Sequence, residues 1–95
     1  MTETQVIPGS ITVRYWAGAK HAAGTDRDEL ETDTALTLAE VRGRAVALHP
    51  GTRLGEVLGA CSALVGEQPV GKADPASVEV RPGETVEFLP PFAGG

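Results

Sequence analysis

The sequence contains a single cysteine, so a disulfide framework within the chain is excluded. Cys61 lies in an apolar run, and we expect a buried small hydrophobic residue there rather than a reactive thiol. No run of about 18 apolar residues is present, so no membrane-spanning helix is expected. The polar start, Met-Thr-Glu-Thr-Gln, lacks a basic segment followed by an apolar one, so no secretory signal is predicted. We therefore expect a cytoplasmic protein.

Positive charge is also scarce. Eight Lys and Arg residues stand against 13 Asp and Glu residues, which gives a formal net charge of −5 at pH 7. Nucleic acids and anionic membranes both bind basic surfaces, so this balance argues against either partner. Carboxylates concentrate in residues 26–33, which we interpret as a solvated face.

Residue patterns for a self-sufficient active site are missing as well. His21 and His49 have no cysteine or second histidine nearby, so we predict neither a metal site nor a bound cofactor. Residues 66–72 have the glycine and lysine spacing of a phosphate-binding loop, but Ala73 cannot supply the hydroxyl that holds magnesium. No serine lies in the setting of a nucleophile elbow.

What the sequence does contain is the pattern of a small mixed sheet. Five segments have the alternation or composition of strands: residues 11–16, 27–32, 61–65, the stub 69–70, and 84–89. We expect the first two to pair as a hairpin around a loop with Gly18 and Gly24. The second should be an edge strand, because among its residues only Leu30 faces inward. Residues 72–77 are expected to form a surface loop, and Pro82-Gly83 fits the centre of a type II turn.

The strongest helix signal covers residues 37–49. Thr37 and Glu40 have the spacing of a capping box, in which each side chain binds the other residue's backbone N–H. Four apolar residues recur at three- and four-residue intervals and should form one buried stripe: Leu38, Val41, Ala45 and Leu48. Pro50-Gly51 is expected to end the helix, and Thr52 to cap a shorter one.

These elements predict an α+β domain. The simplest packing is a mixed sheet of about four to five strands with one main helix and a second short helix on one face. The first and last strands would lie parallel at its centre, joined by a long crossover. We expect residues 1–9 to be a flexible lead-in, residues 10–89 the folded domain, and residues 90–95 an extended tail.

An apolar patch is expected on the open face of this sheet. If Val86 and Phe88 point into the core, Leu89 points outward, and Trp16 falls on the same outward face of the first strand. Trp16 and Leu89 could then meet beside the start of the tail, with Pro69 as a neighbour. A cluster that holds the single tryptophan suggests a binding surface, whereas the alternative is that Trp16 covers the end of the core.

The C-terminal tail carries the one unusual chemical group. Pro90 and Pro91 lack a backbone N–H and have fixed φ, so they should leave the sheet as a stiff extended arm. Gly94 and Gly95 have no Cβ and can pass through a channel too narrow for side chains. The terminal carboxylate must be activated before it reacts, and without an ATP site in this chain a partner must activate it. The alternative is a frayed terminus, as at most C-termini.

Three stretches resemble the MoaD/ThiS family of ubiquitin-like (β-grasp) sulfur carriers, most closely the molybdopterin synthase small subunit. Residues 15–20 (YWAGAK), continuing to 24–26 (GTD), resemble the family's first strand and following loop. Residues 83–88 (GETVEF) resemble its final turn and strand. The tail 89–95 (LPPFAGG) is similar to the small subunit's ending, which is more specific than Gly-Gly alone. The likeness covers about residues 10–95.

The resemblance implies a β-grasp fold and a sulfur-transfer cycle. An E1-like adenylating enzyme (MoeB type) would use ATP to join AMP to Gly95, and a persulfide donor would convert the carboxylate to a thiocarboxylate. The tail would then enter a pocket of the large subunit (MoaE type), where sulfur passes to cyclic pyranopterin monophosphate. Two such transfers build the dithiolene of molybdopterin. The chain would be the sulfur-donating subunit, not catalytic alone.

The same resemblance implies which residues face the partner. On the domain these are Trp16, Lys20, Pro69 and Leu89, and along the tail they are Pro90, Pro91, Phe92 and Ala93. Lys20 stands where the family often has Arg, which keeps the charge but loses the bidentate fork. Residues 42–59 depart most from the family pattern.

Two alternatives remain open. Carriers that supply sulfur for thiamin, cysteine or a tungsten cofactor use the same tail chemistry, although Pro90-Pro91-Phe92 favours molybdopterin. A ubiquitin-like modifier or a non-catalytic binding module is the other alternative. In a modifier, Gly95 would be found in isopeptide linkage to lysines rather than as a thiocarboxylate.

Overall fold

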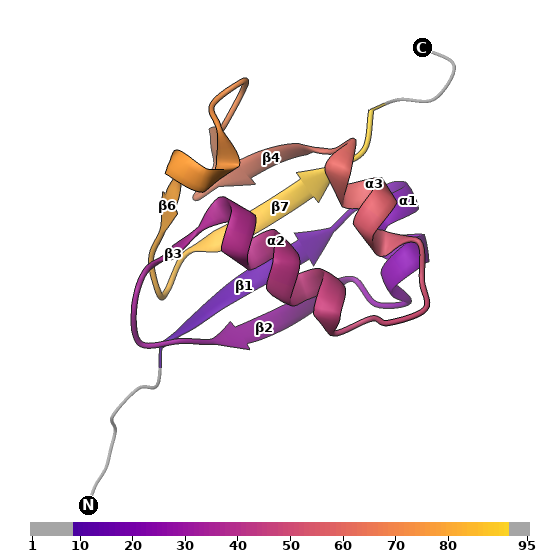
Figure 1. Cartoon of the computed structure of the whole chain (residues 1–95), viewed down its shortest axis with the longest axis horizontal. Coiled ribbons are helices and arrows are strands. Elements are labelled where there is room, and N and C mark those ends of the chain that lie inside the picture. The colour runs from indigo at the N-terminus through magenta and orange to yellow at the C-terminus, as the bar shows by residue number, and fades with distance from the viewer. Residues whose placement is uncertain (1–8, 92–95) are drawn as a thin grey trace, which may run out of the picture.

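The main sheet has five strands in the order β2-β1-β7-β4-β5 (Figure 1). The computed structural model describes residues 9–91, so the expected lead-in, apart from Gly9, and residues 92–95 of the tail lie outside the described residues. The strands are β1 (Ser10–Tyr15), β2 (Arg27–Glu31), β4 (Ser62–Val65), β5 (Gln68–Pro69) and β7 (Thr85–Leu89). Alternation and composition located all five to within about two residues, the usual uncertainty of such boundaries.

The centre of the sheet is the parallel pair of β1 and β7, as predicted. Val13 is the register partner of Val86, and Tyr15 that of Phe88. β2 pairs with β1 and β4 pairs with β7, both antiparallel. The edge position of β2 is also as predicted, and its row of charged side chains suits a strand that no neighbour covers.

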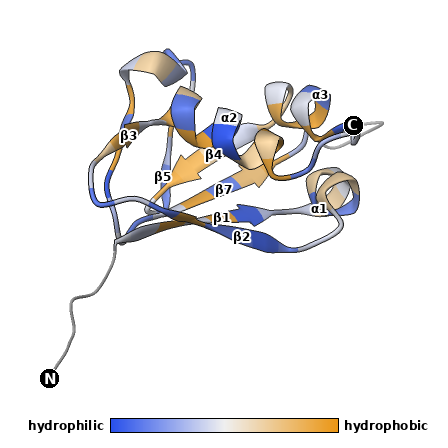
Figure 2. Ribbon diagram, turned by 60° about the horizontal axis from the view of Figure 1, so that its bottom comes forward, coloured by the Kyte–Doolittle hydropathy of each residue, from blue (hydrophilic) through white to orange (hydrophobic). Residues whose placement is uncertain are grey.

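Three helices lie on one face of this sheet (Figure 2). They are α1 (Ala17–Ala23), α2 (Leu38–Ala47) and α3 (Leu54–Gly59). The loop expected after the first strand was wrong, because this segment forms α1. Ala19 and Ala23, four residues apart, bury one face of α1, and Gly24 ends it with φ 76° and an N–H bond to the Lys20 carbonyl at 2.9 Å. Gly24 thus adopts the left-handed conformation that ends many helices.

The predicted capping box of α2 is present. The Thr37 hydroxyl accepts the Glu40 N–H at 3.0 Å, and the Glu40 carboxylate accepts the Thr37 N–H at 2.8 Å. Leu38, Val41 and Ala45 are buried, as predicted. Leu48 is 51% exposed, so its predicted place in the buried stripe was wrong. The cause is that α2 ends at Ala47.

A second, two-stranded sheet was not predicted. β3 (Leu36–Thr37) pairs antiparallel with β6 (Glu79–Val80), and two-residue strands are too short to show alternation. A 3₁₀ helix, η2 (Pro75–Ser77), lies within the expected loop. The type II turn is present: Gly83 has φ 94°, and the Glu84 N–H binds the Arg81 carbonyl at 3.0 Å.

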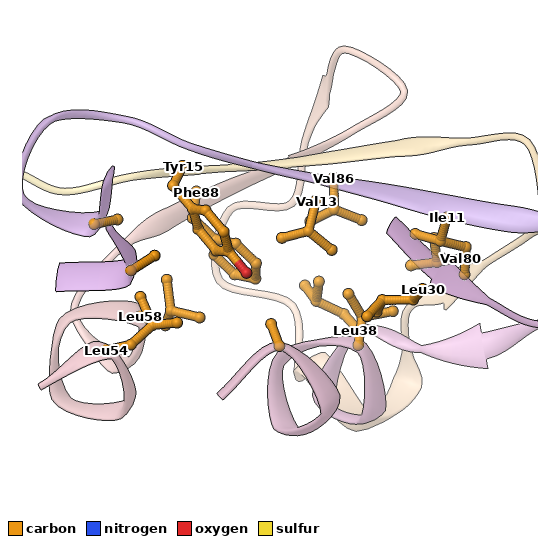
Figure 3. Close-up of a cluster of buried hydrophobic side chains, with 14 residues drawn as sticks. Ile11, Val13, Tyr15, Leu30, Leu38, Leu54, Leu58, Val80, Val86 and Phe88 are labelled. Atoms are coloured by element: carbon orange, nitrogen blue, oxygen red, sulfur yellow. The ribbon is translucent and has the colours of Figure 1, made fainter. Parts of the chain in front are cut away.

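The core lies between the sheet and the helices. Figure 3 shows the side chains of β1 and β7 facing those of α2 and α3. The largest fully buried side chains of the core are Tyr15, Phe88, Ile11, Leu54, Leu58, Val13, Val41, Val80 and Val86. This packing leaves the opposite face of the sheet open. Among residues 9–91, no helix is long and apolar enough to cross a membrane.

Candidate functional site

The root of the tail lies where β7 ends. Leu89 closes the strand, Pro90 is half-buried, and Pro91 is exposed. Pro90 lies beside α1, because a Cβ added to Gly18 would be 4.0 Å from the Pro90 Cγ. In Figure 1 the strand ends at the side of the molecule where α1 and α3 lie. The predicted reactive end, Phe92-Ala93-Gly94-Gly95, lies outside the described residues.

One row of side chains crosses the open face through all five strands. The register partners in this row are Arg27, Arg14, Glu87, Leu64 and Pro69. Charged groups occupy the row over β2, β1 and β7, and apolar groups occupy it over β4 and β5. Along this row, the open face changes from charged to apolar side chains beyond Glu87.

Trp16 stands at the charged part of this row, next to the tail. Its indole N–H donates to a Glu87 carboxylate oxygen at 2.9 Å, and the Arg14 guanidinium carbon lies 4.7 Å from its ring centroid. Its backbone N–H donates to the Phe88 carbonyl at 3.2 Å. Because Arg14 and Glu87 both face outward, the indole lies on the open face and does not cover the end of the core. Trp16 is 40% exposed.

The three other domain residues predicted to face the partner lie in different parts of the fold. Lys20 is exposed on α1, one helical turn from Trp16. Leu89 is half-buried at the same end of the sheet as Trp16, because Trp16 and Leu89 directly follow the register partners Tyr15 and Phe88. Pro69 lies three strands from β1, at the far edge beside Leu64. The structure places Trp16, Leu89 and Pro69 on the open face of the sheet, whereas Lys20 lies on α1, on the helix side. The binding role of all four stays a prediction.

A cluster of three polar side chains was missed from the sequence. The Tyr15 hydroxyl donates to Asp28 Oδ2 at 2.7 Å, and His49 Nε2 lies 2.6 Å from the same oxygen. The Tyr15 and His49 rings meet edge to face at 6.1 Å between centroids. Burial raises the pKa of Tyr15 above its ordinary value, and the hydrogen bond and charge of Asp28 raise it further.

This cluster corrects the interpretation of residues 26–33 as a wholly solvated face. Only 20% of the Asp28 side chain is exposed, and only 16% of His49. The available signal was strand parity, because Asp28 alternates onto the same face as the buried Leu30. The cluster lies on the helix side of the sheet, away from Trp16, and it joins β2 to the end of α2.

Cys61 packs partly buried against the core. Its Sγ donates to the Val57 carbonyl at 3.1 Å, and burial raises the pKa of its thiol to about 11. This environment supports a packing role over a reactive thiol. Within residues 9–91, no group of three or more His, Cys, Asp or Glu side chains is placed to hold a metal ion.

The fold places the chain among ubiquitin-like β-grasp proteins, with a mixed sheet, parallel central strands and helices on one face. The model of the ThiS family matches residues 13–95, so the chain belongs to this family of ubiquitin-like (ThiS/MoaD) sulfur carriers. None of the curated proteins matches the sequence significantly.

Solved structures agree on the fold. SAMP1 from Haloferax volcanii has a TM-score of 0.75 at 19% identity, with 92% of this chain and 100% of that chain covered. A putative molybdopterin converting factor subunit 1 from Pyrococcus furiosus has a TM-score of 0.70 at 18% identity, covering 88% and 99%. A complex of subunits 1 and 2 of the molybdopterin-converting factor from Helicobacter pylori matches with a TM-score of 0.59 at 22% identity, covering 90% and 99%. At such identities the likeness establishes the fold alone.

Proposed function

We propose that this chain is the sulfur-carrying small subunit of a molybdopterin synthase, with the sulfur held as a thiocarboxylate on Gly95. The observation that carries the proposal is the sequence of residues 89–95 (LPPFAGG), which continues directly from the central strand of a ThiS-family domain. The Pro90-Pro91-Phe92 segment favours molybdopterin over the other sulfur pathways.

The fold suits the delivery of a tail into another protein's active site. β7 has hydrogen-bonded neighbours on both sides, β1 and β4, and it buries Val86 and Phe88 in the core. The root of the tail is therefore held firmly. Six residues, 90–95, reach at most about 20 Å when extended, which is enough to carry the carboxylate into a deep pocket.

The proposed chemistry takes place on the terminal carboxylate. An adenylating partner of the MoeB type joins AMP to Gly95 and releases pyrophosphate from ATP, which creates an electrophilic carbonyl carbon. A persulfide sulfur attacks this carbon and displaces AMP, and a thiol then reduces the S–S bond to leave the thiocarboxylate. This chain supplies the carboxylate and the docking surface, and its partners supply the nucleotide and the sulfur.

The proposed acceptor complex contains a large subunit of the MoaE type. The H. pylori structure, which shares the fold, is itself a complex of subunits 1 and 2 of a molybdopterin-converting factor. We assign Trp16, Lys20, Pro69 and Leu89 to the docking surface, and Pro90, Pro91, Phe92 and Ala93 to the segment inside the partner. There, sulfur would pass to cyclic pyranopterin monophosphate.

One observation favours a second function. The likeness to SAMP1 is strong, and a related structure is described as small archaeal modifier protein 1. A modifier would use the same adenylated Gly95 but transfer it to lysine amines. Carriers for thiamin, cysteine or a tungsten cofactor would share the thiocarboxylate and differ only in the acceptor.

Reconstitution distinguishes molybdopterin synthesis from the other sulfur-transfer pathways. Thiocarboxylated chain, a large subunit of the MoaE type and cyclic pyranopterin monophosphate are incubated together, and the product is measured by its fluorescent oxidised pterin. Conversion to molybdopterin is expected, with the tail returned as a carboxylate. A thiocarboxylated chain that yields no product here, but drives thiazole or cysteine synthesis with the corresponding enzymes, would contradict the molybdopterin assignment.

A further inference from the structure

We propose that Arg14 and Glu87 are positioning residues, which hold the Trp16 indole in place as a preformed anchor for the partner that receives the tail. This inference rests on the proposed function. Arg14 and Glu87 are register partners on the two central strands, and both contact Trp16 on the open face.

Trp16 is both exposed and restrained. It is 40% exposed, yet its backbone N–H binds Phe88, its indole N–H binds Glu87 at 2.9 Å, and the Arg14 guanidinium covers one ring face at 4.7 Å. An exposed indole without such contacts would sample several rotamers. Here the hydrogen bond fixes the ring edge and the cation fixes one face, so the other face is presented in one orientation.

The frame that holds the indole is rigid. Arg14 and Glu87 alternate with Val13, Tyr15, Val86 and Phe88, which are among the most buried side chains of the core. Both positioning residues therefore project from a part of the backbone that packing holds on its other face. Glu87 also stands two residues before Leu89, so the orientation of Trp16 is tied to the strand from which the tail departs.

The remaining surface indicates what the anchor meets. Leu64 and Pro69 continue the row of register partners beyond Glu87, and Leu89 lies at its tail side. These apolar side chains lie on the same open face as the indole, beyond Glu87, so the anchor suits an apolar surface of the large subunit. An aromatic side chain that is fixed before binding loses no further rotamer freedom when the partner binds. If the contacts that fix it are removed, this entropy loss falls on binding and raises the Kd by about 2- to 10-fold.

The test uses the single tryptophan as its own probe. Glu87→Ala and Arg14→Met each remove one contact with the indole, whereas Glu87→Gln keeps an oxygen that accepts the indole N–H. Matched controls are Glu31→Ala and Arg27→Met, which remove the same charges from β2, the neighbouring strand of the sheet. The full-length chain is measured free and with a large subunit of the MoaE type, by tryptophan anisotropy and by calorimetry.

We expect Glu87→Ala and Arg14→Met to lower the anisotropy of free Trp16 and to raise the Kd by about 2- to 10-fold. Glu87→Gln and both controls should match the unmodified chain. In a Trp16→Ala background, Glu87→Ala and Arg14→Met should have no further effect, because they act through the indole. Circular dichroism and thermal melts confirm that each variant is folded.

Three results would overturn the inference: unchanged anisotropy and Kd in both contact-removing variants, equal weakening by Glu87→Gln and Glu87→Ala, or full additivity with Trp16→Ala. The second and third would assign Arg14 and Glu87 to direct charge contacts with the partner. These outcomes are separate from failure of the proposed function, which appears as a chain that cannot be sulfurated at Gly95 or that, once sulfurated, yields no molybdopterin. The anisotropy of the free chain tests the positioning even then.

Discussion

At the scale of single residues, the Tyr15 hydroxyl connects three parts of the chain. It donates to Asp28 on β2, and the same carboxylate oxygen contacts His49 after α2. A buried hydroxyl without an acceptor would destabilise the fold. Asp28 accepts the hydrogen bond of the Tyr15 hydroxyl, which is buried together with the Tyr15 ring. The cluster contributes to stability and lies away from the open face on which we place binding.

This cluster predicts an alkaline loss of stability. The pKa of Tyr15 is raised in the folded state, so its contribution is fully present below the unfolded value of about 10 and falls as the pH rises above it. Denaturant unfolding at pH 8 and pH 11 should show a larger loss for the unmodified chain than for Tyr15→Phe. Because Tyr15 is the single tyrosine, the difference between the two proteins isolates it. Equal losses would contradict the assignment.

Cys61 provides a second prediction at this scale. Burial raises the pKa of its thiol to about 11, so little thiolate is present at pH 8. We expect alkylation of the folded chain at pH 8 to be slower than that of the unfolded chain by on the order of 100-fold. Mass spectrometry of an iodoacetamide time course measures both rates. Similar alkylation rates in the folded and unfolded chains would show that the thiol is reactive. Cys61 would then be a second candidate for carrying sulfur.

At the scale of elements, α2 depends on its start as well as its buried stripe. The reciprocal bonds between Thr37 and Glu40 satisfy two backbone N–H groups at the first turn. Thr37→Ala should lower the free energy of unfolding by about 1 kcal/mol, and Thr37→Ser, which keeps an acceptor, should change it little. Chemical denaturation compares the three proteins. A Thr37→Ser variant as unstable as Thr37→Ala would show that the threonine methyl, rather than the cap, is what matters.

The elements also show how far the sequence predicts the fold. Alternation in residues 11–16 and 84–89 located the two central strands, because each strand buries one face against helices. Their parallel pairing was predicted from the order of the elements and the simplest packing, and it is present. α1 was not predicted, since Gly18 and Gly24 resemble loop residues and its buried residues are only alanines, Ala19 and Ala23. Its helical state is decided by packing against α3 and β1, which local sequence does not record.

In the candidate site too, local pattern was predictable from the sequence and tertiary contacts were not. Parity placed Trp16 and Leu89 on the open face, since alternation requires no knowledge of distant contacts. The contacts of Trp16 with Arg14 and Glu87 depend on the β1–β7 register, which the sequence does not give. The Tyr15–Asp28–His49 cluster was missed for a related reason, because residues from three elements meet there through tertiary packing.

At the scale of the whole molecule, the proposed function gives the domain the role of holding the root of the tail in place. Packing fixes β7 at the centre of the sheet, and the chemistry is expected at Gly95, six residues beyond this strand. Deletion of Gly95 should therefore leave the unfolding transition unchanged and abolish sulfur loading. Thermal melts and sulfur-transfer assays check the two halves separately. Persistent sulfur transfer after the deletion would exclude the carrier function in every form.

The central claim is that the terminal carboxylate of Gly95 carries sulfur, and intact-protein mass spectrometry tests it most directly. The full-length chain is incubated with ATP, an adenylating partner and a persulfide donor, and a reaction without ATP is the control. We predict a mass gain equal to the exchange of one oxygen for one sulfur, located by fragmentation at Gly95 and absent without ATP. An unchanged mass, or sulfur located at Cys61 instead of Gly95, would contradict the account.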